Sequence, residues 1–157
     1  MQLTSKGRYA VMAMADLSAH SRATALPGAG AAVADRAVTV AEIAARQGIS
    51  PAYLEQLFAR LRRAGLVAGV RGPGGGYRLA RPAETVTVAD VIAAVDERVA
   101  TTRCKPGARV GCTGNAERCV THDLWAALAC QINDFLAGVS LRDVADGRVR
   151  MARELAS

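Results

Sequence analysis

The sequence predicts a mainly α-helical protein with a small β-hairpin wing: a winged helix-turn-helix followed by a long dimerisation helix. The first observation is the order of the elements, because two helical segments joined by a short turn precede a hairpin with a glycine-rich tip. The second is composition. The residues AVILMFWYC make up 51% of the 157 residues and aromatic residues only 4%, which suits packed helices better than a β-sandwich.

The chain begins with a predicted helix and then an insert. Thr4 is placed to cap the helix. The apolar positions at helical spacing are Tyr9, Ala10, Val11, Met14 and Leu17. The segment 21–37, SRATALPGAGAAVADRA, contains proline and repeated glycine and alanine, so it predicts a loop insert without site chemistry.

Two capped helices follow the insert. Thr39 and Glu42 form the capping box of a helix from Val40 to Gln47, which Gly48 ends. The next helix has Ser50 as its predicted N-cap and Pro51 in its first turn, and Gly65 stops it. Its expected buried stripe is Leu54, Leu57, Phe58 and Leu61, and its polar stripe is Tyr53, Gln56, Arg60 and Arg63.

The remaining elements are a hairpin and three helices. Two extended runs, LVAGVR and YRLA, flank a Gly-Pro-Gly-Gly-Gly tip. Thr87 and Asp90 form a second capping box for a helix near Val88 to Val95. Thr121 opens a long helix to about Phe135 or Leu136, ended by Gly138, and a last helix is expected from Leu141 to Leu155.

Charge and hydropathy limit the function classes. The net charge of +6 and the pI near 9.7 favour an anionic partner, although a solvated basic surface is the alternative. No segment has the roughly 18 consecutive apolar residues of a membrane span, and the amino terminus lacks the apolar stretch of a secretory signal. We therefore expect a cytoplasmic protein without a membrane partner, in which thiols stay reduced and bind metal more often than they form disulfides. No converging acid–base pair is visible, so we do not expect an enzyme.

The polar face of the 51–63 segment fits the major groove of double-stranded DNA. Gln56 can pair with adenine, Glu55 can accept from cytosine, and Arg60 can bind guanine or phosphate. The other DNA-binding candidates are Tyr53 on the same helix and Arg71 and Arg78, which flank the hairpin tip. Glycines at the tip let backbone N–H groups approach phosphate closely. The alternative is an ordinary solvated helix face.

The segment RCKPGARVGCTGNAERCVTHDLW predicts a metal or iron–sulfur site. Its candidate ligands are Cys104, Cys112, Cys119 and His122, separated by seven, six and two residues. Zinc sites usually use closer cysteine pairs, so the spacing disfavours a Cys3His zinc site without excluding it. An imidazole ligand makes a cluster less negative than a fourth thiolate and can be removed by protonation. Cys130 is not counted as a ligand, and we expect it to be a small buried thiol.

Several segments together resemble the winged-helix repressor family of iron–sulfur cluster regulators. They are LTSKGRYAV, RQGIS, YLEQLF, RGPGGGY, AVDE and the Cys…Cys…Cys-x-x-His-x-x-Trp run, and the resemblance covers nearly the whole chain. It implies a homodimer that holds a [2Fe–2S] cluster through the four candidate ligands. It also implies control of cluster assembly genes, with cluster occupancy setting operator choice and the iron–sulfur assembly machinery donating the cluster.

The resemblance also implies DNA contacts and reveals two departures. The implied contacts are Tyr53, Glu55, Gln56 and Arg71, with the glutamate tuning operator choice. The 21–37 insert and the cysteine intervals are both longer than in the family pattern, and longer loops cost little entropy.

These observations divide the chain into three parts and leave other functions open. The parts are a winged helix-turn-helix DNA-binding domain (1–98), a cluster-binding loop (99–122) and a dimerisation helix with a C-terminal helix (121–157). A nitric oxide or redox-sensing repressor of the same family is one alternative, although that branch generally lacks a histidine ligand. A zinc-stabilised DNA-binding protein also fits, whereas an electron-transfer protein explains only the cysteines.

Overall fold

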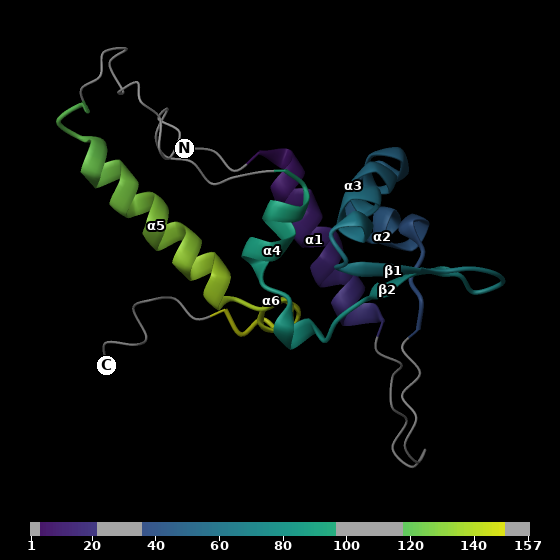
Figure 1. Cartoon of the computed structure of the whole chain (residues 1–157). Helices are drawn as coiled ribbons and strands as arrows, with labels where there is room; N and C mark the ends of the chain where they lie inside the picture. The colour runs from purple at the N-terminus through teal and green to yellow at the C-terminus, as the bar shows by residue number, and fades with distance from the viewer. Residues whose placement is uncertain (1–3, 22–35, 97–117, 150–157) are drawn as a thin grey trace.

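The structure is a computed structural model, which describes residues 4–21, 36–96 and 118–149. In Figure 1 the hairpin projects from one side of a helical body, and the longest helix, α5, extends from the other side. The elements in chain order are α1 (Ser5–His20), α2 (Val40–Gln47), α3 (Pro51–Arg63), β1 (Val67–Val70), β2 (Gly76–Leu79), the 3-10 helix η1 (Ala83–Thr85), α4 (Val88–Ala94), α5 (His122–Gly138) and α6 (Leu141–Ala145). The predicted mainly helical fold with one hairpin is confirmed.

Helix α1 lies at the centre of the body and packs against α2, α3, α4 and α6 (Figure 1). Thr4 caps it by accepting a hydrogen bond from the Lys6 backbone N–H at 3.3 Å. Ala10, Met14 and Leu17 of the predicted apolar stripe are fully buried. Most of the predicted insert, residues 22–35, lies outside the described residues. At its edges, the Arg36 N–H donates to the Ser21 carbonyl oxygen at 2.8 Å.

The helix-turn-helix follows the predicted caps closely. The Glu42 N–H donates to Thr39 Oγ1 at 3.2 Å, and the Thr39 N–H donates to Glu42 Oε2 at 2.8 Å. Gly48 ends α2 in the left-handed conformation, at φ 65°. Ser50 occupies the N-cap position of α3 as predicted, although its hydroxyl makes no capping bond. Its carbonyl oxygen instead accepts from the Tyr53 and Leu54 N–H groups. The buried stripe of α3 is Leu54, Leu57, Phe58 and Leu61, as predicted.

The hairpin is fixed to the body by a third segment of extended chain. β1 and β2 are antiparallel, with Val67 opposite Leu79 and Val70 opposite Gly76. Val38 and Tyr77 exchange backbone hydrogen bonds of 2.9 and 2.8 Å, which ties the chain entering α2 to the base of the hairpin. Gly76 has φ 146°, and a Cβ there would lie 2.5 Å from the Val38 carbonyl oxygen. Glycine is therefore required at position 76, where the hairpin backbone approaches that of Val38.

Helix α6 belongs to the same core as the winged helix. The Val88 N–H donates to the Val139 carbonyl, and the Leu141 N–H donates to the Val86 carbonyl at 2.8 Å. Leu141 is fully buried in the common core. The predicted helix from Leu141 to Leu155 is too long, because α6 ends at Ala145 and Gly147 follows at φ 66°. Residues 150–157 lie outside the described residues.

Helix α5 is long and exposed. It begins directly after Thr121, as predicted, but it runs through Gly138 and so extends two or three residues past the predicted end at Phe135 or Leu136. None of its residues is buried in the single chain. Leu124, Trp125 and Phe135 are its large exposed apolar residues. Cys130 is exposed as well, so the expectation of a buried thiol is wrong for one chain by itself. None of the described helices combines the length and apolar character needed to cross a bilayer.

Candidate nucleic-acid interface and metal site

The exposed face of α3 presents the side chains predicted to read bases. Glu55 and Gln56 are exposed, and no hydrogen bond or ion pair engages their side chains in the part of the chain that the structure describes. Tyr53 is half-buried, because its ring packs edge-on against Tyr9 of α1 with ring centroids 6.0 Å apart. The carboxylate of Glu55 and the amide of Gln56 are therefore available to base edges. The ring of Tyr53, by contrast, is held in place by its contact with Tyr9.

Arg60 lies one turn after Gln56 and is engaged within the protein. Its Nη1 donates to Oδ2 of Asp96, the second residue after α4, and the two side chains form an ion pair. Sequence reasoning missed this pair, since the two residues are 36 positions apart. It also missed Arg62, which is exposed near the end of α3 with Arg63. Basic residues in a last helical turn interact favourably with the helix dipole, and Arg60, Arg62 and Arg63 all stand in that turn.

The hairpin carries the other two predicted DNA contacts. Arg71 follows β1 at the start of the turn, and Arg78 stands in β2 opposite Ala68; both are exposed. The turn is closed by the Gly75 N–H, which donates to the Gly72 carbonyl oxygen at 2.8 Å. In Figure 1 the tip stands clear of the helices. Such a basic, extended hairpin can follow a DNA backbone beside the groove that a recognition helix occupies.

A buried carboxylate attaches the helix-turn-helix to α1. Arg46 of α2 donates to both carboxylate oxygens of Asp16, with distances of 2.6 to 3.1 Å. Gln47 Nε2 donates to the same carboxylate at 2.7 Å. Burial raises the pKa of Asp16, but the hydrogen bonds from Arg46 and Gln47 outweigh it and hold the pKa below its ordinary value. Asp16 therefore stays ionised and fixes how α2 sits on α1.

The structure describes two of the four predicted metal ligands. Cys119 is half-buried and precedes α5, of which His122 is the first residue. The His122 N–H donates to the Cys119 carbonyl oxygen at 2.9 Å, so one turn brings the two residues close along the backbone. Cys104 and Cys112 lie outside the described residues. Among the residues that are described, no three His, Cys, Asp or Glu side chains gather into a metal site.

The two described ligands fit an iron–sulfur cluster by their chemistry. A thiol and an imidazole are the donors found together in clusters with mixed cysteine and histidine ligation. Both stand at the exposed amino-terminal end of α5. Whether they converge with Cys104 and Cys112 on one cluster stays a prediction.

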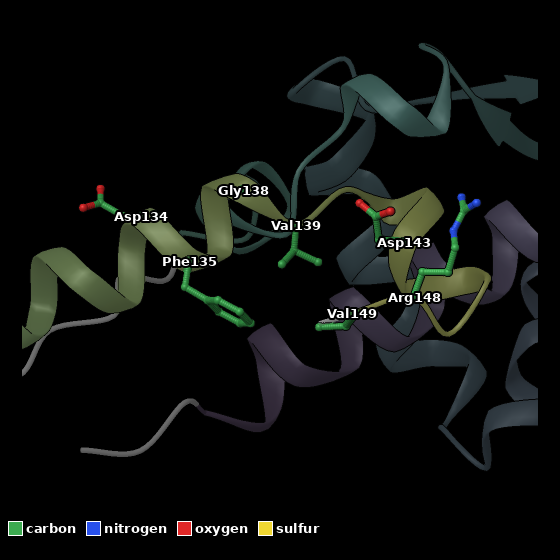
Figure 2. Close-up of a pocket in the computed structure, with 7 residues that line it drawn as sticks. All are labelled: Asp134, Phe135, Gly138, Val139, Asp143, Arg148 and Val149. Carbon is green, nitrogen blue, oxygen red and sulfur yellow. The ribbon is translucent and has the colours of Figure 1, made fainter. Parts of the chain in front are cut away.

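A pocket of about 650 Å³ lies at the opposite end of α5, where the chain turns into α6 (Figure 2). It is lined by Asp134, Phe135, Gly138, Val139, Asp143, Arg148 and Val149. Asp143 already accepts the capping bonds of Ser140, which lower its pKa, and Arg148 pairs with Asp146 at 2.8 Å. No predicted site residue lines this pocket.

The exposed polar face of α3 and the basic hairpin beside it form the arrangement of a winged-helix, DNA-binding transcriptional regulator. The chain belongs to the Rrf2 family: the family model, described as an iron-dependent transcriptional regulator, matches residues 3–147. Its relatives are transcriptional regulators rather than enzymes, which agrees with the prediction that the chain is not an enzyme.

Relatives and solved structures support this assignment. The chain is 49% identical over 148 residues to the HTH-type transcriptional regulator IscR of Photorhabdus laumondii, covering 94% of this chain and 81% of that protein. It is 50% identical over 144 residues to IscR of Vibrio vulnificus, covering 92% and 77%. The structure of T. potens IscR matches with a TM-score of 0.69 at 32% identity, covering 97% and 93%. CymR, the global cysteine regulator of B. subtilis, matches with a TM-score of 0.71 at 25% identity, covering 93% and 97%.

Proposed function

We propose that this regulator senses an iron–sulfur cluster and binds double-stranded operator DNA as a cytoplasmic homodimer. The proposed cofactor is a [2Fe–2S] cluster held by Cys104, Cys112, Cys119 and His122 and donated by the iron–sulfur assembly machinery. Its occupancy would set operator choice among the genes of cluster assembly. The observation that carries the proposal is the Cys119–His122 turn at the start of α5, in a chain of an iron-dependent regulator family.

Each part of the chain has a distinct task in this proposal. Gln56 and Glu55 read base edges, and Arg71 and Arg78 bind phosphates. The exposed apolar residues of α5 pair with those of a second copy, because a helix without any buried residue needs a partner to cover its apolar side. When bound, the cluster supplies a reducible centre whose presence depends on iron supply and oxidation.

The first test is chemical. Protein purified without oxygen should contain iron and acid-labile sulfide in equal amounts and absorb visible light. A colourless protein that contains zinc would instead identify a zinc-stabilised DNA-binding protein. Operator fragments selected from random DNA by the purified protein should then bind differently to the cluster-bound and cluster-free forms.

Replacing His122 with alanine tests the ligand set. His122→Ala should fold and dimerise normally but lose its cluster faster, because one of the four ligands is gone. Cys130→Ala is the matched control, since it removes a potential ligand from the same helix outside the proposed set. The measurement is the decay of visible absorption during exposure to a chelator. Equal decay in wild type and His122→Ala would remove His122 from the set.

Replacing Arg71 with alanine tests the hairpin contact. Arg71→Ala should weaken operator binding and reduce the slope of log affinity against log salt by about one, the effect of losing one phosphate contact. Arg148→Ala, which removes the same charge beside α6, should leave both quantities unchanged. Titration of labelled operator at several salt concentrations measures both. Unchanged affinity in Arg71→Ala at moderate salt would exclude the contact.

A further inference from the structure

The ion pair between Arg60 and Asp96 joins α3 to the end of the segment that leads into the predicted cluster-binding loop, 99–122. Arg60 lies four residues after Gln56, so the two side chains leave α3 on the same side. Asp96 is the last described residue before the segment 97–117, and seven residues separate it from Cys104. The pair therefore connects a residue of the DNA-facing helix with the chain that leads to the first candidate ligand.

The protein core fixes the backbone that presents Asp96. The preceding residue, Val95, is fully buried, and the Asp96 N–H donates to the Ala93 carbonyl oxygen at 3.0 Å. Asp96 has φ 55° and is the one residue other than glycine with positive φ in the described parts of the chain. This turn out of α4 directs the carboxylate towards α3, where Arg60 meets it.

The pair is exposed enough to exchange for a phosphate. The side chains of Arg60 and Asp96 are 37% and 76% exposed. Pairs of this kind shift an equilibrium by only about two- to five-fold. A DNA phosphate can compete with the Asp96 carboxylate for Arg60 because the pair is this weak, and while Arg60 is bound to Asp96 the carboxylate offsets part of its charge. Loss of this pair is therefore enough to change the charge that α3 offers to DNA.

We propose that Asp96 is a positioning residue that restrains Arg60 and transmits the state of the cluster-binding loop to the recognition helix. The inference rests on the proposed function, because it assumes both operator binding and a cluster in the loop. Asp96 itself is not required to touch either DNA or the cluster. Its effect on DNA acts through Arg60 alone, and that property separates this role from simple charge repulsion.

The first experiment measures the restraint in cluster-free, full-length protein. Asp96→Asn removes the charge, and asparagine accepts positive φ as aspartate does. Operator affinity should rise about two- to five-fold, and the salt slope should steepen by about one because Arg60 gains a phosphate. Asp134→Asn on α5 makes the same charge change away from α3 and should have no effect. In an Arg60→Ala background, Asp96→Asn should also have no effect.

Two results of this experiment overturn the proposal. One is unchanged affinity in Asp96→Asn. The other is an equal gain with and without Arg60, which would show that Asp96 repels DNA directly.

The second experiment measures transmission. The ratio of cluster-bound to cluster-free operator affinity should be closer to one in Asp96→Asn than in wild type, whichever form binds more tightly. Equal ratios in the two proteins overturn the proposed transmission. Failure of the underlying function is recognised separately, because wild-type protein would then lack iron and sulfide or would not bind the selected operator.

Discussion

Removing Arg46 should destabilise the protein more than neutralising Asp16, although the two side chains form one ion pair. The reason is their unequal burial: the side chain of Asp16 is 1% exposed and that of Arg46 is 31% exposed. Arg46→Ala leaves a buried carboxylate whose remaining partners are Gln47, which donates at 2.7 Å, and His20, whose Nδ1 lies 3.5 Å from Oδ1. Asp16→Asn leaves a guanidinium group that water can reach.

The magnitudes follow from this asymmetry. Removing one partner of a buried pair costs about 3–5 kcal/mol when the remaining charge stays buried, so we expect a value in this range for Arg46→Ala. Losing hydrogen bonds to a charged group that water can partly replace costs about 1–3 kcal/mol, which we expect for Asp16→Asn. The double variant should be more stable than Arg46→Ala, because it contains no unpaired buried charge.

The pH dependence of the free energy of unfolding gives a second, independent test of this asymmetry. In wild type the pKa of Asp16 lies below its ordinary value, so its stabilising contribution is present above about pH 4 and decreases as the pH falls towards the folded-state pKa. Without Arg46, only Gln47 and His20 oppose the effect of burial, so we expect the pKa of Asp16 to rise above its ordinary value and stability to be lost as the pH rises. The free-energy difference between wild type and Arg46→Ala should therefore widen from pH 4 to pH 7.

Urea unfolding at one fixed protein concentration measures all three variants, since the stability of the proposed homodimer would depend on concentration. Equal destabilisation by Arg46→Ala and Asp16→Asn would refute the reasoning. So would a double variant as unstable as the sum of the two single changes, or a free-energy difference independent of pH.

Two further predictions concern backbone approach and the core. Gly76→Ala should destabilise the protein by more than the roughly 1 kcal/mol expected for Gly74→Ala. The reason is that only the added Cβ at position 76 meets the Val38 carbonyl oxygen. Equal urea midpoints for the two variants would contradict this close approach of Gly76 to Val38. Leu141→Ala should cost about 2–5 kcal/mol in a single cooperative transition, because this fully buried residue belongs to the common core. Val149→Ala, at an exposed position, should change stability by less than about 0.5 kcal/mol.

Features set by residues three or four apart were predictable from the sequence. The capping boxes of α2 and α4 and the buried stripe of α3 depend on neighbours along one helix, and the structure confirms them. A third box, in which Ser140 and Asp143 cap α6, has the same local signature but was missed. The helix α6 was predicted too long because the prediction rested on apolar spacing. That spacing did not reveal that Gly147 adopts a left-handed conformation just after the helix ends.

Features set by distant residues were not predictable. The bonds between Asp16 and Arg46 span 30 positions and leave no pattern in either segment. For the same reason the sequence made Arg60 a candidate DNA contact without revealing its carboxylate partner. Cys130 illustrates a further limit: helical spacing gives the face on which a residue lies but not what covers that face.

A backbone hydrogen bond between Ser21 and Arg36 holds together the two ends of the segment 22–35. This makes the segment a convenient place to modify the protein. Arg36 also donates a side-chain hydrogen bond to Glu42 of the α2 capping box, so the far edge of the insert is held where α2 begins. Doubling the length of a flexible loop costs only about 0.6 kcal/mol. We therefore expect the protein to accept an epitope, a fluorophore-binding peptide or an immobilisation tag between residues 21 and 36, with α3, the hairpin and α5 left available for binding measurements.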